Sequence, residues 1–191
     1  HHAIEDISIM RSIPNMTVLC PGDPFETEEL IKRSYEKNGP TYIRLGKNGE
    51  PIIHKNKNKI EIGEPISITK GNDLILITTS NTLELAKSWV DEWYQEGIHV
   101  NLISMPTIKP INQLSIKKLI DMKIPMITLE EHSIIGGLGS TISEIIAESG
   151  KSVKFKRMGI NDEFSHYVGG AEIQRKKLNI LQNPEKSWFL K

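Results

Sequence analysis

The sequence has a single cysteine, Cys20, among its 191 residues. One cysteine cannot form an internal disulfide, and this usage favours a reducing compartment, so we expect a cytoplasmic protein. Cys20 ends the apolar run TVLC, which is typical of a buried strand. We therefore interpret this thiol as a buried bystander rather than a nucleophile.

Long apolar runs and an excess of charge are missing as well. No apolar stretch approaches the roughly 20 residues that a membrane helix needs. The opening HHAIEDISIM lacks the basic and apolar regions of a secretory signal. Lys and Arg number 24, as do Asp and Glu. This balance gives no electrostatic reason to expect a nucleic acid or a membrane as partner.

Strands and helices alternate regularly in the second part of the chain. The expected strands are residues 74–78, 100–104, 126–129 and 153–155, separated by expected helices at 83–96, 115–122, 141–149 and 171–181. Such alternation predicts an α/β fold, with a mainly parallel sheet and helices on both faces.

The first part of the chain reads as the end of another α/β domain. A helix over residues 4–13 precedes a short strand, and Asp23, Pro24 and Glu26 then provide an N-cap, a proline at the first helical position and a reciprocal acid. The first helix follows no strand, so we expect its apolar face to lack a sheet within this chain. Pattern and composition divide the chain into residues 1–47, a linker at 48–67, and a second domain at 68–191.

A glycine-rich segment invites a dinucleotide-binding interpretation. Residues 137–142 (GLGSTI) partly match G-x-G-x-x-G before a helix, whose N-terminus attracts anions. Ile142 stands where the third glycine belongs, and Thr141 with Glu144 predicts a capping box at the helix start. We favour a tight turn with close backbone packing. His132 is interpreted as hydrogen-bonding a neighbour, and His54 has no acid or nucleophile at a suggestive spacing.

Five segments, in order, resemble the transketolase family. The opening HHAIEDISIMRSIPNMTVLCPGDPFE is similar to the stretch that follows Gly-Pro-Thr in transketolases, and residues 39–47 (GPTYIRLGK) are similar to the last strand of their pyrimidine-binding domain. Residues 108–112, 128–140 and 159–164 resemble the family's C-terminal domain. The resemblance implies a partial pyrimidine-binding domain followed by a transketolase C-terminal domain.

The resemblance also implies a chemistry. Transketolases use thiamine diphosphate and Mg²⁺ to move a two-carbon unit from a ketose phosphate to an aldose phosphate, in pentose phosphate metabolism, as homodimers. The metal-binding domain and the activating glutamate would lie upstream of His1, so we expect no cofactor, no metal and no turnover from this chain alone. Its partners would be sugar phosphates and its own N-terminal part or a separate N-terminal subunit.

Three residues receive substrate roles from the resemblance. His1 corresponds to the histidine after Gly-Pro-Thr, which reaches the donor sugar near its phosphate and is our candidate catalytic residue. Lys47 stands where the family usually has a phosphate-binding arginine, and offers a point charge instead of a planar fork. Arg44 is the alternative phosphate ligand, on the strand face opposite Leu45.

Other functions remain open from the sequence. The second domain alone can serve as a non-catalytic dimerisation module. Deoxyxylulose-phosphate synthase and the β subunit of ketoacid dehydrogenases are related thiamine-diphosphate enzymes, although the runs RSIPNM and IKP favour transketolase over both.

Overall fold

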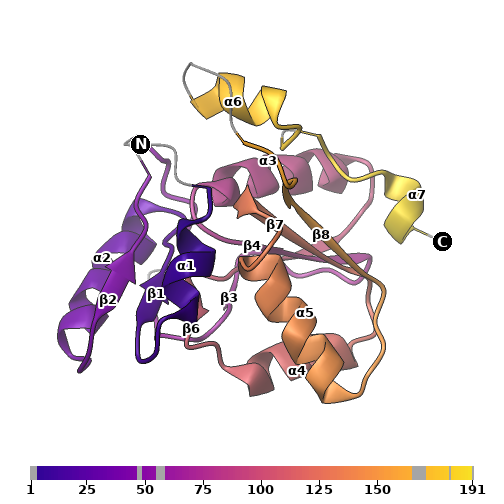
Figure 1. The fold of residues 1–191 in the computed structure, drawn as a ribbon. Coiled ribbons are helices and arrows are strands. Elements are labelled where there is room, and N and C mark those ends of the chain that lie inside the picture. Colours follow the sequence, from indigo (N-terminus) through magenta and orange to yellow (C-terminus); the bar gives the residue numbers. More distant parts are fainter. Residues whose placement is uncertain (1–3, 47–48, 55–58, 165–170, 181, 191) are drawn as a thin grey trace.

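The computed structural model describes residues 4–46, 49–54, 59–164, 171–180 and 182–190. The chain forms two sheets with helices around them, and the small N-terminal sheet lies beside the large one (Figure 1). His1 and Lys47 lie outside the described residues.

The large sheet has the strand order β3-β5-β4-β7-β8. Its strands are β3 (Ile66–Ser67), β4 (Leu74–Thr78), β5 (Val100–Ser104), β7 (Met126–Ser133) and β8 (Phe155–Ile160). All neighbours are parallel except β3, which pairs antiparallel with β5. The expected mainly parallel sheet is confirmed.

The last strand lies further along the chain than the sequence predicts. The expected strand 153–155 overlaps β8 only at Phe155, because β8 pairs with β7 from Met126–Phe155 to Ser133–Ile160, with a register shift between Leu129 and Ser133. β8 lies at the edge of the sheet and carries exposed charged residues such as Lys156 and Arg157. It therefore lacks the apolar run that predicts a buried strand.

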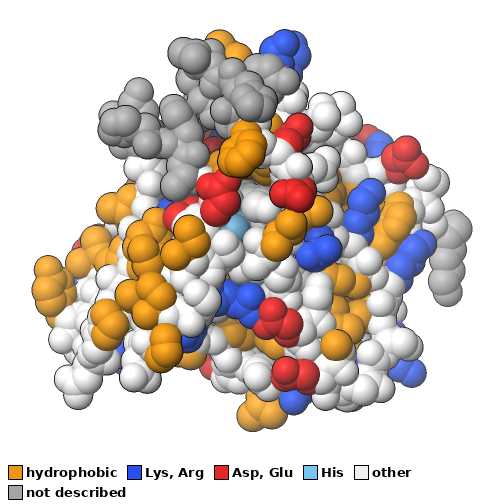
Figure 2. Space-filling model, viewed as in Figure 1, with side chains coloured by type: hydrophobic (Ala, Val, Ile, Leu, Met, Phe, Trp, Pro, Cys, Tyr) orange, Lys and Arg blue, Asp and Glu red, His pale blue; other side chains and the backbone are white. Residues whose placement is uncertain are grey.

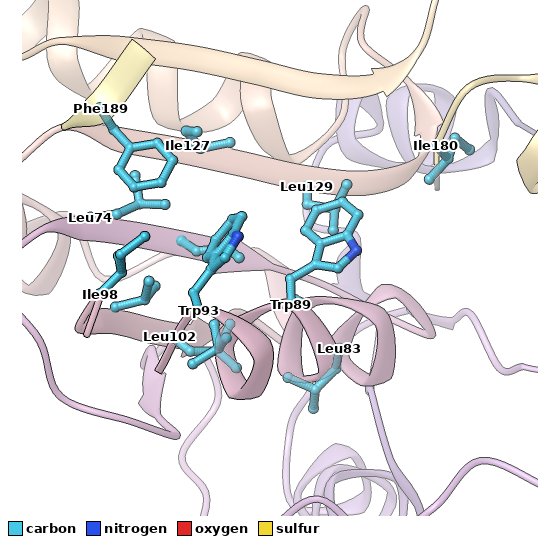
Figure 3. Packing of buried hydrophobic residues seen from close by; sticks show 14 of the residues in the cluster. Leu74, Leu83, Trp89, Trp93, Ile98, Leu102, Ile127, Leu129, Ile180 and Phe189 are labelled. Carbon is cyan, nitrogen blue, oxygen red and sulfur yellow. The ribbon is translucent and has the colours of Figure 1, made fainter. Parts of the chain in front are cut away.

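Helices cover both faces of the large sheet. α3 (Thr82–Gln95) packs on one face, and α4 (Gln113–Asp121) and α5 (Leu138–Ser149) pack on the other. Trp89 and Trp93 point from α3 toward the strands (Figure 3), and Trp93 is fully buried. Burying large aromatic side chains contributes most to such a core. The chain ends with α6 (Ala171–Lys177) and α7 (Lys186–Phe189). Among the described helices, none has the length and apolar character to cross a membrane.

The small sheet is built from both parts of the chain. β1 (Thr17–Leu19) pairs parallel with β2 (Thr41–Ile43), and its other edge pairs antiparallel with β6 (Thr107–Lys109). β6 lies between the expected strand 100–104 and the expected helix 115–122, where the sequence pattern predicted no strand.

The first helix does pack on a sheet, so that expectation is wrong. α1 (Asp6–Ser12) buries Ile7 completely, in the same core cluster as Val18 of β1 and Ile75 and Ile77 of β4. α2 (Pro24–Tyr35) packs on the other side with Leu19, in a cluster of its own. The N-terminal segment is therefore integrated with the large domain through a shared core.

Candidate functional site

The strand order of the large sheet reverses at β4, because β5 and β7 pair on opposite sides of this strand. β4 is followed by β5 on one side, whereas β7 pairs on the other, and in such sheets ligands bind outside the carboxyl ends of the strands at this switch point. Here the N-terminal segment lies over that position. Ser80 N–H donates to the Cys20 carbonyl at 2.9 Å, and Ser133 N–H donates to the Ile4 carbonyl at 2.8 Å. The N-terminal segment of the chain thus packs against the position that this fold offers to a ligand.

Arg44 lies at this junction and has several partners. Its Nε is 3.3 Å from Asp6 Oδ2, and its Nη2 donates to the Glu131 carbonyl at 2.9 Å. Tyr42 Oη donates to the same Asp6 oxygen at 2.7 Å, and the side chain of Asp6 is only 9% exposed. We call Asp6, Tyr42 and Arg44 the Arg44 cluster. It joins the first turn of α1 to β2 and to β7.

A second ion pair extends the junction to the C-terminal part of the chain. Arg175 Nε lies 2.5 Å from Glu131 Oε2, and Arg175 Nη2 donates to the Asn81 carbonyl at 3.5 Å. α6 is thereby held against the carboxyl end of β7 and the start of α3. The motif Glu130-Glu131 thus supplies structural contacts with both of its side chains.

Glu130 occupies the helix start that the glycine-rich segment suggested for a phosphate. Its two carboxylate oxygens accept the N–H groups of Leu138 at 2.7 Å and Gly139 at 2.8 Å, the first residues of α5. Burial raises the pKa of Glu130 to about 7. An internal carboxyl group therefore satisfies the orphan donors that an external anion would need.

The predicted capping box at this helix is wrong. α5 begins three residues before Thr141, whose hydroxyl donates to the Gly137 carbonyl at 2.9 Å, and Glu144 pairs with Arg11 of α1. The close packing expected of the turn is confirmed. A Cβ on Gly137 would lie 1.9 Å from Glu130 Oε2, so no side chain fits there.

His132 hydrogen-bonds its neighbour and Cys20 is buried, as the sequence indicated. His132 is fully buried, lies 2.7 Å from the Ser133 carbonyl through Nδ1, and accepts the Ser8 N–H at Nε2 at 3.3 Å. Burial lowers its pKa, which keeps the imidazole neutral. Cys20 is buried, and burial raises its pKa to about 12.

Sequence reasoning missed a buried trio formed by Asp23, Glu26 and His54. His54 Nδ1 lies 3.0 Å from Asp23 Oδ2, and His54 Nε2 lies 3.3 Å from Glu26 Oε1. Asp23 Oδ2 also accepts the N–H groups of Ile53 at 2.9 Å and His54 at 3.2 Å. The trio attaches the segment 49–54 to the start of α2. Asp23 and His54 are 31 positions apart in the sequence, so no short spacing indicated that they pair.

The environment of the trio shifts all three pKa values. Burial raises the pKa of Glu26 to about 7. Burial opposes ionisation of Asp23 as well, but hydrogen bonds from His54 and from the backbone outweigh it and lower the pKa of Asp23 to about 2. Burial disfavours the imidazolium of His54, but the hydrogen bond to Asp23 and the charge of Glu26 outweigh it and raise its pKa.

A cleft of about 400 Å³ lies at the carboxyl ends of β1 and β2. Pro21 and Gly22 follow β1, and Leu45 and Gly46 follow β2, so the strand ends form its walls. Lys47 is the next residue in sequence after Gly46. A second cleft, of about 450 Å³, separates α1 from α4 and α5. Both of its cations have partners: Arg11 pairs with Glu144, and Lys109 donates to the Arg11 and Ile13 carbonyls.

The described residues do not fit the diphosphate and Mg²⁺ of thiamine diphosphate. Among them, no three His, Cys, Asp or Glu side chains are grouped as metal ligands. The start of α5 is occupied by Glu130, and acidic Glu28 and Glu50 line the cleft beside β2.

The two sheets define an α/β protein. Its large sheet is doubly wound, and the small sheet packs near the point where the strand order of the large sheet reverses. Residues 64–176 match the transketolase C-terminal domain, and residues 1–50 match the transketolase pyrimidine binding domain. The chain belongs to the transketolase family.

Relatives of this chain include proteins made as separate sections or subunits. A putative transketolase C-terminal section of Methanocaldococcus jannaschii is 40% identical over 86% of this chain and 52% of the relative. One subunit of the apulose-4-phosphate transketolase of Actinobacillus succinogenes is 31% identical over 94% of this chain and 58% of the relative. The chain thus spans somewhat more than half of the length of these relatives. 1-Deoxy-D-xylulose-5-phosphate synthase of Listeria monocytogenes is 34% identical over 86% of this chain and 28% of that enzyme.

Solved structures agree with this assignment. A split gene transketolase, described as an inactive β4 tetramer, superposes with a TM-score of 0.85 at 29% identity, over 94% of this chain and 60% of that chain. Transketolase from Leishmania mexicana superposes with a TM-score of 0.72 at 17% identity, over 98% of this chain and 26% of that chain, which shows the common fold.

Proposed function

We propose that this chain is the C-terminal section of a thiamine-diphosphate-dependent transketolase, which transfers a two-carbon unit from a ketose phosphate to an aldose phosphate. The observation that carries the proposal is the match of residues 1–50 to the pyrimidine binding domain, followed by the match of residues 64–176 to the C-terminal domain. The activity belongs to the assembled enzyme. The diphosphate, the Mg²⁺ and the activating glutamate are held by a preceding segment or by a separate N-terminal subunit.

The small sheet supports a partner on its outer side. β2 lies at the edge of that sheet, with no strand beyond it among the described residues. Ile9 on α1 is 57% exposed, and Ile13, directly after α1, is 37% exposed. Hydrophobic side chains gather on the side of α1 and β2 in Figure 2. An open edge next to exposed apolar side chains suits another α/β unit, which would extend the sheet and cover them.

Substrate recognition is proposed for His1 and Lys47. In the assembled enzyme, Lys47→Ala should lower kcat/KM for phosphorylated donors by about 10- to 150-fold, because losing one hydrogen bond to a charged group costs about 1.5–3 kcal/mol. Lys47→Arg should retain most activity, and His1→Ala should cost about as much as Lys47→Ala. With an unphosphorylated ketose, Lys47→Ala should have nearly the same kcat/KM as the wild type. His2→Ala is the matched control for His1→Ala. An equal loss of kcat/KM for both donors would contradict a phosphate-binding role for Lys47.

The proposed activity is tested by supplying the partner. The chain is mixed with an N-terminal transketolase subunit from the same genome, thiamine diphosphate and Mg²⁺, and transfer from xylulose 5-phosphate to ribose 5-phosphate is measured. We expect transfer that saturates at equimolar chains. Synthesis of deoxyxylulose phosphate from pyruvate and glyceraldehyde 3-phosphate, with no transfer between sugars, would assign the chain to the synthase branch. Absence of both activities would favour a non-catalytic dimerisation module.

A further inference from the structure

We propose that Arg44 is a positioning residue that acts through Asp6, and that it does not bind the substrate phosphate. The inference rests on the proposed transketolase function. It concerns a residue for which the sequence suggested direct phosphate binding.

The guanidinium group of Arg44 already has internal partners. Its Nε lies 3.3 Å from Asp6 Oδ2, its Nη2 donates to the Glu131 carbonyl at 2.9 Å, and the side chain is only 16% exposed. An arginine that binds phosphate typically does so through two parallel N–H···O bonds from its planar fork. Arg44 is also absent from the lining of the cleft at the end of β2, to which Leu45 and Gly46 contribute.

Asp6 is the centre of the cluster. Its Oδ2 is near Arg44 and accepts the Tyr42 hydroxyl at 2.7 Å, so one carboxylate oxygen joins a side chain of β2 to the side chain that directly follows this strand. Burial, together with the hydrogen bond to Asp6, raises the pKa of Tyr42 to about 12, which keeps the phenol a donor. A buried charge with several partners has one favoured geometry, since moving it away leaves each partner unsatisfied.

The Arg44 cluster links the start of α1 to the residue that follows β2. These two segments of the chain lead to the proposed substrate residues His1 and Lys47. Asp6 begins α1, five residues after His1, and Arg44 follows β2, three residues before Lys47. The link from Arg44 to the Glu131 carbonyl further holds both to β7 of the large sheet. Misplacing reacting groups by about 1 Å can cost about 100-fold in rate, so the cluster acts on catalysis without touching substrate.

The test uses the assembled enzyme and the variants Arg44→Met, Asp6→Asn and Tyr42→Phe, with Tyr94→Phe as control. Tyr94 is 60% exposed on α3 and should tolerate loss of its hydroxyl. We expect Arg44→Met and Asp6→Asn each to lower kcat/KM by about 10- to 100-fold, equally for phosphorylated and unphosphorylated donors. Arg44→Lys should recover part of the loss. The double variant of residues 6 and 44 should lose no more than either single variant, because both remove the same interaction.

Asp6→Asn separates the two roles of Arg44. If Arg44 bound the phosphate, removing the neighbouring acid would leave phosphorylated donors unaffected or improve their KM, and Arg44→Met would harm only those donors. Either result overturns the proposal. Unchanged kcat/KM per folded, assembled enzyme, with only a lower melting temperature, would make the cluster merely structural and also overturns it. A wild-type enzyme without two-carbon transfer would instead overturn the proposed function, and this inference with it.

Discussion

Glu130→Ala is expected to lower the free energy of unfolding by about 2–6 kcal/mol. The variant leaves the N–H groups of Leu138 and Gly139 buried without an acceptor, and each such group costs about 1–3 kcal/mol. A typical domain is stable by only about 5–15 kcal/mol, so a large part of the stability would be lost. The helix α5 should fray at its start, because Glu130 is the residue that satisfies these donors.

The measurement is urea unfolding of the whole chain. Glu148→Ala is the matched control, since Glu148 is exposed on α5 itself, and should change stability by no more than about 0.5 kcal/mol. Glu130→Gln keeps the shape but presents one acceptor, so its loss should fall between the two. A Glu130→Ala protein as stable as the Glu148→Ala protein would show that water or backbone rearrangement satisfies the start of α5.

Stability should fall as the pH rises from about 5 to about 7.5. The folded-state pKa values of Glu26 and Glu130 are raised to about 7, so the stability that they contribute is complete below their unfolded value and is lost as the pH rises through 7. His54 has a raised pKa and loses its contribution in the same direction above its ordinary value. His132, with a lowered pKa, opposes this trend only below about 6.5, its ordinary value.

Glu26→Gln isolates the contribution of the trio. The amide does not titrate, so the slope of unfolding free energy against pH over this window should become shallower. Glu36→Gln is the control, because Glu36 lies at the end of the same helix with its side chain 67% exposed. Stability that rises with pH over the same window, or a slope unchanged in Glu26→Gln, would contradict the buried, protonated state of Glu26.

Local patterns predicted most of the large domain. The strand 74–78 and the strand 100–104 are found at those residues, and α3 begins one residue before its predicted start, because continuous apolar runs and helical periodicity reflect burial directly. Asp23 caps α2 through the Glu26 N–H at 2.8 Å, as its position before Pro24 indicated. The side chain of Glu26, however, accepts from the Gly22 N–H, so the reciprocal bond reaches one residue further than a capping box requires.

Long-range pairings were not available from local patterns. β6 is short and pairs only with β1, about 90 residues away, and the His54 trio joins residues with no periodic relation. The role of Arg44 was equally hidden, because its partners Asp6 and Glu131 lie 38 and 87 residues away in sequence. Such contacts follow from tertiary packing, which the sequence of one chain does not display.

We propose that the thiamine diphosphate site is complete only when this chain is joined by its N-terminal part or by a separate N-terminal subunit. Calorimetric titration of thiamine diphosphate with Mg²⁺ tests it most directly, first with this chain alone and then with the equimolar mixture of this chain and the N-terminal subunit. The account predicts weak or no binding to the chain alone and tight, stoichiometric binding to the mixture. Micromolar binding to the isolated chain would contradict it.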